Sequence, residues 1–337
     1  MHAATTQDDY GIPLREAMQG YLMDAKIAEQ SARYIVLKTQ RLSLFVEWCE
    51  KQGAKQLLQV TSTVIRSFIV HLQGIKAQEL NPRRPTQEKN LSAMTIKGYR
   101  TIIDAFFVWC KREGFLGGRD VPTRTIPQQK IPQFVIETFT MGQLAAMLDA
   151  CELSSPIGYR DYAILLMLMD TGIRASELCG LTLDNVFEDY IKVFGKGSKE
   201  REVGIGPTAS RAVWKYIHQF RGAFHPLDIE KHVFLGVGGV PLLRSGLYQA
   251  LERIGDKAGV SGVRLSPHTF RHTFAVNYLA NGGDVFKLSR ILGHTEMQTT
   301  QIYLKDFQSR QARVEHSQYS LVERHKLGKR PTKKKKD

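Results

Sequence analysis

Residues 159–178 read YRDYAILLMLMDTGIRASEL, and this stretch decides how the second half of the chain folds. The unbroken apolar run 163–169 predicts a buried central helix. Gly172 supplies the turn that ends the helix. Because this turn follows a buried helix, Arg174 should lie near the protein interior, where an arginine needs an anionic partner. That partner is either Glu177, three residues further on, or a bound phosphate.

Around this helix the sequence predicts a mainly α fold with a small antiparallel three-stranded sheet. Short strands are expected at 186–187, 190–194 and 202–205, the last two joined by the turn Gly195-Lys196-Gly197-Ser198. Helices are expected at 141–151, 207–221, 245–258, 267–279, 284–292 and 295–304. These elements predict one mixed α/β domain over residues 136–322.

The first part of the chain predicts a separate helical domain over residues 10–116. Apolar residues follow helical spacing in four segments, at 13–29, 31–51, 62–72 and 92–114. Residues 117–135 hold two glycines and three prolines and should form a linker. The linker is basic, so it either crosses a DNA backbone or is a solvated tether. The Lys-rich segment 323–337 should be a disordered tail.

The charge of the chain favours a polyanionic partner. The net charge is +14 and the pI is near 9.6. The last fifteen residues contribute +6, so the remaining chain still carries +8. Nucleic acid is the commonest partner of such a protein, although a merely basic surface is the alternative.

The cysteines and the apolar runs indicate a cytoplasmic protein. Cys49, Cys110, Cys151 and Cys179 lie far apart without a Cys-x-x-Cys pair, as expected of free thiols in a reducing compartment. Residues 1–10 are polar and acidic, unlike a signal peptide. The seven-residue apolar run 163–169 is too short to span a bilayer, so we expect no membrane partner.

The segment HTFRH at residues 268–272 has more than one interpretation. His268 and Arg271 share one helix face, and His268 follows a proline at the helix start, where free N–H groups attract an anion. His268 and His272 also have the spacing of a zinc-binding helix. However, Thr269 stands where the metalloprotease pattern has Glu, and Arg271 would repel the ion. Two ordinary histidines are the remaining alternative.

Lys196 and Tyr303 can be interpreted only together with the residues around them. Lys196 is flanked by glycines at the hairpin tip, which lets the backbone approach another molecule closely. Gly197 stands where a nucleotide-binding Walker motif needs Ser or Thr. Tyr303 follows the segment Leu292-Gly293-His294 on an apolar helix, where a lone tyrosine is usually a core residue.

Together these segments resemble the tyrosine recombinase (lambda integrase-like) family, especially its Xer-type and simple mobile-element integrases. The family has an ordered pattern of Arg, Lys, His-x-x-Arg, His and Tyr. The matching residues here are Arg174, Lys196, His268, Arg271, His294 and Tyr303. The resemblance covers about residues 140–305, and the preceding helices match the family's core-binding domain only in size and helicity.

The resemblance implies an enzyme, a site-specific recombinase that cleaves and religates DNA. Tyr303 would attack the phosphodiester and become a 3′-phosphotyrosine. Arg174 and Arg271 would clamp the non-bridging oxygens, and His294 would add a hydrogen bond. The reaction would need no cofactor and no metal.

The resemblance also assigns the proton transfers and the partners. Lys196 would be the general acid, and His268 the general base or proton partner near the nucleophile. The partner would be double-stranded DNA with inverted-repeat core sites, bound near the nucleoid by a homotetramer that joins two sites. Such an enzyme integrates, excises or resolves DNA, and we expect it to serve a mobile element. Residues 305–327 would dock onto the neighbouring protomer or else form a frayed end.

Three other functions remain open from the sequence. A non-catalytic DNA-binding regulator would share the basic surface. A type IB topoisomerase-like enzyme would share the chemistry and relax DNA without choosing a site. A zinc hydrolase would use His268, His272 and His294.

Overall fold

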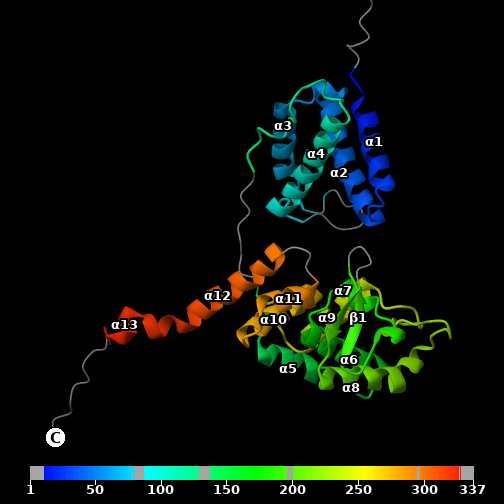
Figure 1. Ribbon diagram of the computed structural model, residues 1–337, viewed down its shortest axis with the longest axis vertical. Helices are drawn as coiled ribbons and strands as arrows, with labels where there is room; N and C mark the ends of the chain where they lie inside the picture. Colours follow the sequence, from blue (N-terminus) through cyan, green and yellow to red (C-terminus); the bar gives the residue numbers. More distant parts are fainter. Residues whose placement is uncertain are drawn as a thin grey trace, which may run out of the picture. The chain divides into compact units, whose positions relative to one another are not determined.

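The protein forms two compact units, residues 1–133 and residues 134–337 (Figure 1). The structure, a computed structural model, describes residues 11–77, 79, 87–128, 137–195, 200–293, 297–325 and 327. No helix in these ranges is both long and apolar enough to cross a membrane.

The first unit contains the four predicted helices. They are α1 (Leu14–Ile27), α2 (Ala32–Lys51), α3 (Ser62–Gly74) and α4 (Ala93–Arg112), with a short 3-10 helix, η1 (Leu57–Gln59). Thr61 and Ser92 cap α3 and α4, because each side chain accepts a backbone N–H of the first turn. Phe45, Phe68 and Phe107 are fully buried between the helices and meet edge to face.

The segment predicted as a linker packs in part against this first unit. Val121 and Ile126 are buried in its core. Arg119 donates to the carbonyl of Leu58 at 2.9 Å, and Arg66 donates to that of Thr125 at 3.1 Å. Residues 117–128 are therefore attached to the helices, whereas residues 129–135 lie outside the described part of the chain.

The second unit is mixed, with one small sheet among helices. Its elements are α5 (Met141–Asp149), α6 (Pro156–Thr171), α7 (Ala175–Cys179), η2 (Leu183–Asn185), β1 (Tyr190–Phe194), β2 (Glu200–Gly204), α8 (Pro207–Lys215), η3 (Tyr216–Phe220), η4 (Arg221–Phe224), α9 (Arg244–Lys257), α10 (Pro267–Ala280), α11 (Val285–Leu292), α12 (Met297–Tyr319) and α13 (Leu321–Arg324). Helix η3 is a single π-helical stretch between α8 and the 3-10 turn η4.

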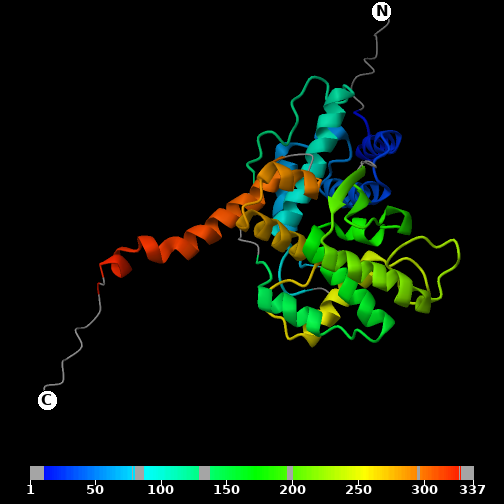
Figure 2. The same ribbon diagram turned by 60° about the horizontal axis from the view of Figure 1, so that its bottom comes forward.

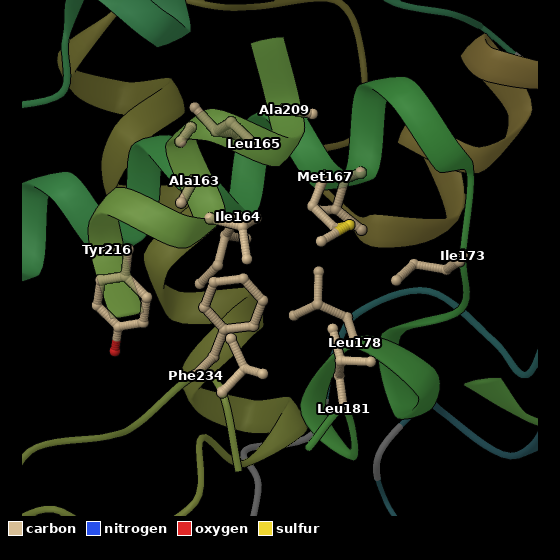
Figure 3. Packing of buried hydrophobic residues seen from close by; sticks show 14 of the residues in the cluster. Ala163, Ile164, Leu165, Met167, Ile173, Leu178, Leu181, Ala209, Tyr216 and Phe234 are labelled. Atoms are coloured by element: carbon tan, nitrogen blue, oxygen red, sulfur yellow. The ribbon is translucent and has the colours of Figure 1, made fainter. Parts of the chain in front are cut away.

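Helix α6 is the predicted central helix. It starts at Pro156 because Ser155 caps it, and proline is well suited to a first helical position. Ile164 and Met167 are buried in one cluster with Phe234 and Leu178 (Figure 3). Gly172 ends the helix in the left-handed conformation, with φ of 58°.

The strand predicted at residues 186–187 does not form. Within the described residues the sheet has two antiparallel strands, with Ile191 opposite Val203. Val186 makes only an isolated bridge to Ile191. The reason is a tight turn, in which the N–H of Phe187 donates to the carbonyl of Tyr190 and leaves too few residues for a third ladder.

Helix α12 continues well past its predicted end at residue 304. Residues 305–319 contain neither glycine nor proline, so nothing in the sequence stops the helix. Its first turns contact α10 and α11, and its later turns extend beyond them (Figure 2). The predicted cap at Thr295 lies outside the described residues.

The four thiols are free, as predicted. Cys49, Cys110 and Cys151 are buried and Cys179 is partly buried. Burial raises the pKa of Cys49 and Cys110 to about 12 and that of Cys151 and Cys179 to about 11, so these thiols are not reactive nucleophiles.

Gly172→Ala should destabilise the second unit by roughly 3 kcal/mol, because a Cβ there is strained and also meets Phe274 Cδ1 at 2.5 Å. Gly282→Ala is the matched control, since Gly282 also has a positive φ but has open space around it, and should cost about 1 kcal/mol. Urea unfolding followed by circular dichroism measures both values. Equal losses would contradict the packing argument.

Candidate active site

Arg174 lies where the turn after α6 leads into α7. Its backbone N–H and its Nη1 both donate to the Glu177 carboxylate at 2.8 Å, and its Nη2 donates to the carbonyl of Gly293 at 2.9 Å. The Glu177 side chain is 1% exposed, whereas that of Arg174 is 36% exposed. Arg174 can therefore have both partners expected from the sequence, Glu177 and a bound phosphate. Glu177 orients the guanidinium, and one side of the guanidinium stays accessible.

The C-terminal end of α11 holds three arginines together. Arg201 Nε donates to the carbonyl of Ile291 at 2.8 Å, and Arg271 Nη2 donates to that of Leu292 at 2.6 Å. The next carbonyl, that of Gly293, accepts from Arg174 as described above. The last carbonyls of a helix lack intrahelical partners and carry the negative end of its dipole, so cations are stabilised there.

Arg271 is the most buried of these arginines. It is 4% exposed, and its Nη1 also donates to the carbonyl of Gly172 at 2.8 Å. Burial, together with repulsion from Arg174, lowers the pKa of Arg271 to about 10, and a hydrogen bond with the Tyr303 side chain opposes this shift. The residue stays charged at neutral pH, and an anion placed beside both arginines would relieve their repulsion.

Glu177 balances part of this positive charge. Its two oxygens accept from Arg201 Nη1 and Nη2 at 2.7 and 2.8 Å. Burial alone would raise the pKa of Glu177, but the hydrogen bonds from Arg201 and Arg174 hold it at about 2. The carboxylate is therefore ionised throughout the physiological range.

Tyr303 lies in α12 next to the buried arginine. It is 4% exposed and belongs to a small apolar cluster with Leu288 and Leu292 of α11. Its ring centroid lies 5.1 Å from that of His272. The structure thus brings Tyr303 together with Arg271, and through the end of α11 with Arg174.

His268 opens α10 one turn before Arg271. Ser266 caps this helix by accepting the N–H of Thr269. The surrounding protein and the positive charges of Arg271 and Arg264 lower the pKa of His268 below its usual value. The imidazole is therefore mostly neutral at pH 7 and able to accept a proton.

Two of the six predicted site residues, Lys196 and His294, lie outside the described residues. The zinc alternative includes His294 and so lies partly outside the described residues, among which no group of three His, Cys, Asp or Glu residues is arranged to hold a metal ion. His272 is fully buried, whereas His268 is exposed.

Arg201 was not predicted from the sequence as a residue of the site. It lies on β2 on the same face as the buried Val203, so it is an arginine at an inward-facing strand position. That alternation is the signal that could have identified it. Glu177 was considered only as a possible partner of Arg174, and its pairing with Arg201 joins elements far apart in sequence.

The residues of the candidate site lie in a part of the chain that is similar to known proteins. The model of the phage integrase family matches residues 137–310. The tyrosine recombinase XerD of Staphylococcus haemolyticus (strain JCSC1435) is 32% identical over 218 residues, which cover 64% of this chain and 73% of that protein. XerD of Staphylococcus aureus (strain N315) is 33% identical, also over 218 residues and with the same shares of both proteins covered.

Solved structures share the fold. The XerH site-specific recombinase bound to a palindromic difH substrate in a post-cleavage complex has a TM-score of 0.66 and 17% identity, covering 93% of this chain and 99% of that chain. The Tn1549 transposon integrase in complex with a circular-intermediate DNA has a TM-score of 0.66 and 16% identity, covering 87% and 95%.

Glu177→Gln should lower the free energy of unfolding at pH 7 by about 3 kcal/mol, because it breaks a buried ion-pair network. The folded pKa of about 2 is lower than the ordinary value of 4.5, so this stability is present above pH 4.5 and is lost as pH falls towards 2. The difference between wild type and variant, measured by urea unfolding, should therefore shrink below pH 4. Glu200→Gln, at an exposed pair with Lys192, should change little. A difference that is independent of pH would contradict the assignment.

Proposed function

Because this chain belongs to the phage integrase family of tyrosine site-specific recombinases, we propose that it cleaves and religates double-stranded DNA through a 3′-phosphotyrosine on Tyr303. One observation carries the proposal. Arg271, buried and hydrogen-bonded to Tyr303, is held on the same helix end as the half-exposed Arg174. A phosphate bound by both arginines would lie within reach of the tyrosine.

The arginines would bind the scissile phosphate. Negative charge develops on its two non-bridging oxygens, and the forked guanidinium donors of Arg174 and Arg271 suit such oxygens better than lysine does. His294 would add a further hydrogen bond. Loss of one such donor typically costs roughly 3–4 kcal/mol of transition-state stabilisation.

The chemical step is an in-line displacement at phosphorus. A bond forms between Tyr303 Oη and the phosphorus, and the bond from phosphorus to the 5′-oxygen breaks. His268, whose lowered pKa leaves it neutral, would accept the tyrosine proton. Lys196 would protonate the departing 5′-oxygen. A 5′-hydroxyl of a second DNA strand would then attack the phosphotyrosine and reverse the same steps, so the energy of the broken bond is conserved.

The helical domain, residues 10–116, would hold the core DNA. Four basic residues are among the side chains that line a groove of about 660 Å³ in the first unit, namely Arg66, Lys97, Arg100 and Arg124. Arg124 comes from the segment 117–135, which fits its proposed passage along a DNA backbone. Basic side chains placed in this way bind phosphates irrespective of sequence, and base contacts would give the specificity.

The C-terminal helices α12 and α13 would join one protomer to the next. Helices α12 and α13 present Tyr319, Leu321 and Val322 with 74%, 67% and 51% exposure. The second unit has a pocket of about 750 Å³ lined by apolar residues of α5 and α10, among them Leu144 and Phe274. We place the exposed end of one protomer on its neighbour, which would build a homotetramer across two inverted-repeat sites. A solved lambda integrase tetramer bound to a Holliday junction is the related precedent.

The enzyme would act at the nucleoid and serve a mobile element, whose DNA it would integrate, excise or resolve. The domains would be the core-binding domain 10–116, the linker 117–135, the catalytic domain 136–322 and the basic tail 323–337. A non-catalytic regulator and a type IB topoisomerase-like enzyme are the alternatives to be tested.

Tyr303→Phe should abolish covalent capture of DNA, because it removes the attacking oxygen and keeps the ring beside His272. The protein is mixed with sheared DNA of its host genome, denatured, and the DNA in covalent adducts is sequenced. We expect wild type and the control Tyr162→Phe to give adducts that share a short inverted repeat. Equal recovery from Tyr303→Phe would favour the regulator. Adducts without a shared site would favour the topoisomerase-like enzyme.

A further inference from the structure

Arg201 links two elements of the candidate anion site, α7 and the end of α11. It lies on β2 with a side chain that is 14% exposed. Its guanidinium binds both Glu177 oxygens at 2.7 and 2.8 Å and the carbonyl of Ile291 at 2.8 Å. It therefore joins α7, which follows Arg174, to the end of α11, which precedes His294.

The pairing with Glu177 decides what Arg174 is free to bind. A buried carboxylate needs strong donors, and Arg201 supplies a bidentate pair. Arg174 then shares only one of the two oxygens through Nη1. Without Arg201, Glu177 would depend on Arg174 for its charge compensation and would compete with a phosphate for that guanidinium.

The backbone at Gly293 is fitted to the same guanidinium. Gly293 has φ of 63°, and a Cβ at this position would meet Arg201 Nη1 at 2.8 Å. The carbonyl of Gly293 is also the acceptor of Arg174 Nη2. Arg201 therefore packs against the peptide that anchors Arg174 and leads into His294.

We propose that Arg201 is a positioning residue for strand cleavage, a role that rests on the proposed function of the site. It donates to both carboxylate oxygens of Glu177 and holds the end of α11 in place. Arg174 therefore keeps its accessible side for the scissile phosphate. Because Nε and both Nη atoms of Arg201 already donate to Ile291 and Glu177, it acts through Arg174 and does not bind the phosphate.

The test separates binding from cleavage. The full-length protein is given a nicked duplex carrying the captured site, so that cleavage is a single turnover. The affinity for the same duplex is measured by fluorescence anisotropy with Tyr303→Phe in every variant, so that no covalent adduct forms. Arg201→Gln should cleave about 100-fold more slowly, the loss expected of a misplaced phosphate clamp, with the Kd changed by less than about twofold. Arg201→Lys, which keeps the charge and loses the fork, should fall between Arg201→Gln and wild type.

Arg221→Gln is the matched control. Arg221 is also buried and also donates to two carbonyls, those of Glu230 and His232, away from the site. It should lose stability and keep the wild-type cleavage rate. In a Glu177→Gln background, Arg201→Gln should slow cleavage by less than about tenfold more, because the two residues act as one unit.

Three results would overturn the proposal. They are cleavage by Arg201→Gln as fast as by Arg221→Gln, a loss of affinity that matches the loss of rate, and independent effects of Arg201→Gln and Glu177→Gln. If Arg201→Gln does not fold, a normal cleavage rate in Arg201→Lys overturns the proposal and a slower rate with unchanged Kd supports it. A wild type that forms no adduct overturns the proposed function itself, whereas a cleaving wild type with an unaffected Arg201→Gln overturns only the positioning role.

Discussion

Three consecutive backbone carbonyls at the end of α11 accept hydrogen bonds from three arginines, and the candidate site depends on this arrangement. Ile291, Leu292 and Gly293 bind Arg201, Arg271 and Arg174 in turn. A helix end leaves such carbonyls unpaired, so the arginines satisfy the helix and the helix fixes the arginines. The contacts that complete this helix end therefore also hold the three arginines of the candidate anion site together.

This arrangement concentrates positive charge that the protein only partly neutralises. Arg174 and Arg201 pair with one carboxylate, that of Glu177, and Arg271 adds a third positive charge nearby. Two unit charges about 4 Å apart near a protein surface interact by about 4 kcal/mol. Burial is the main cause of the lowered pKa of Arg271, and repulsion from Arg174 adds to it. A phosphodiester bound at this point would stabilise the cluster, and more strongly so when charge develops on its oxygens during displacement.

The sequence predicted the features that depend on local patterns. The apolar run 163–169 and the following Gly172 were enough to predict α6 and its end, and the ordered motif predicted Arg174, Arg271 and Tyr303 as site residues before any geometry was known. The structure brings these three residues together. Features set by tertiary contacts were beyond such patterns: the third strand is replaced by a turn at Phe187, and α12 continues because no residue stops it. Arg201 was missed because its partners lie on α7 and α11, far away in the sequence.

The central claim is that Tyr303, beside the arginine cluster, is the nucleophile. Its most direct test is to digest the captured wild-type adduct with nuclease and protease and to locate the nucleotide-bearing residue by tandem mass spectrometry. We expect one modified peptide, in which a phosphodiester joins Tyr303 to the 3′-oxygen of the nucleotide at the cut. A nucleotide found on any other side chain, such as Tyr278 or Tyr319, would show that Tyr303 is not the nucleophile.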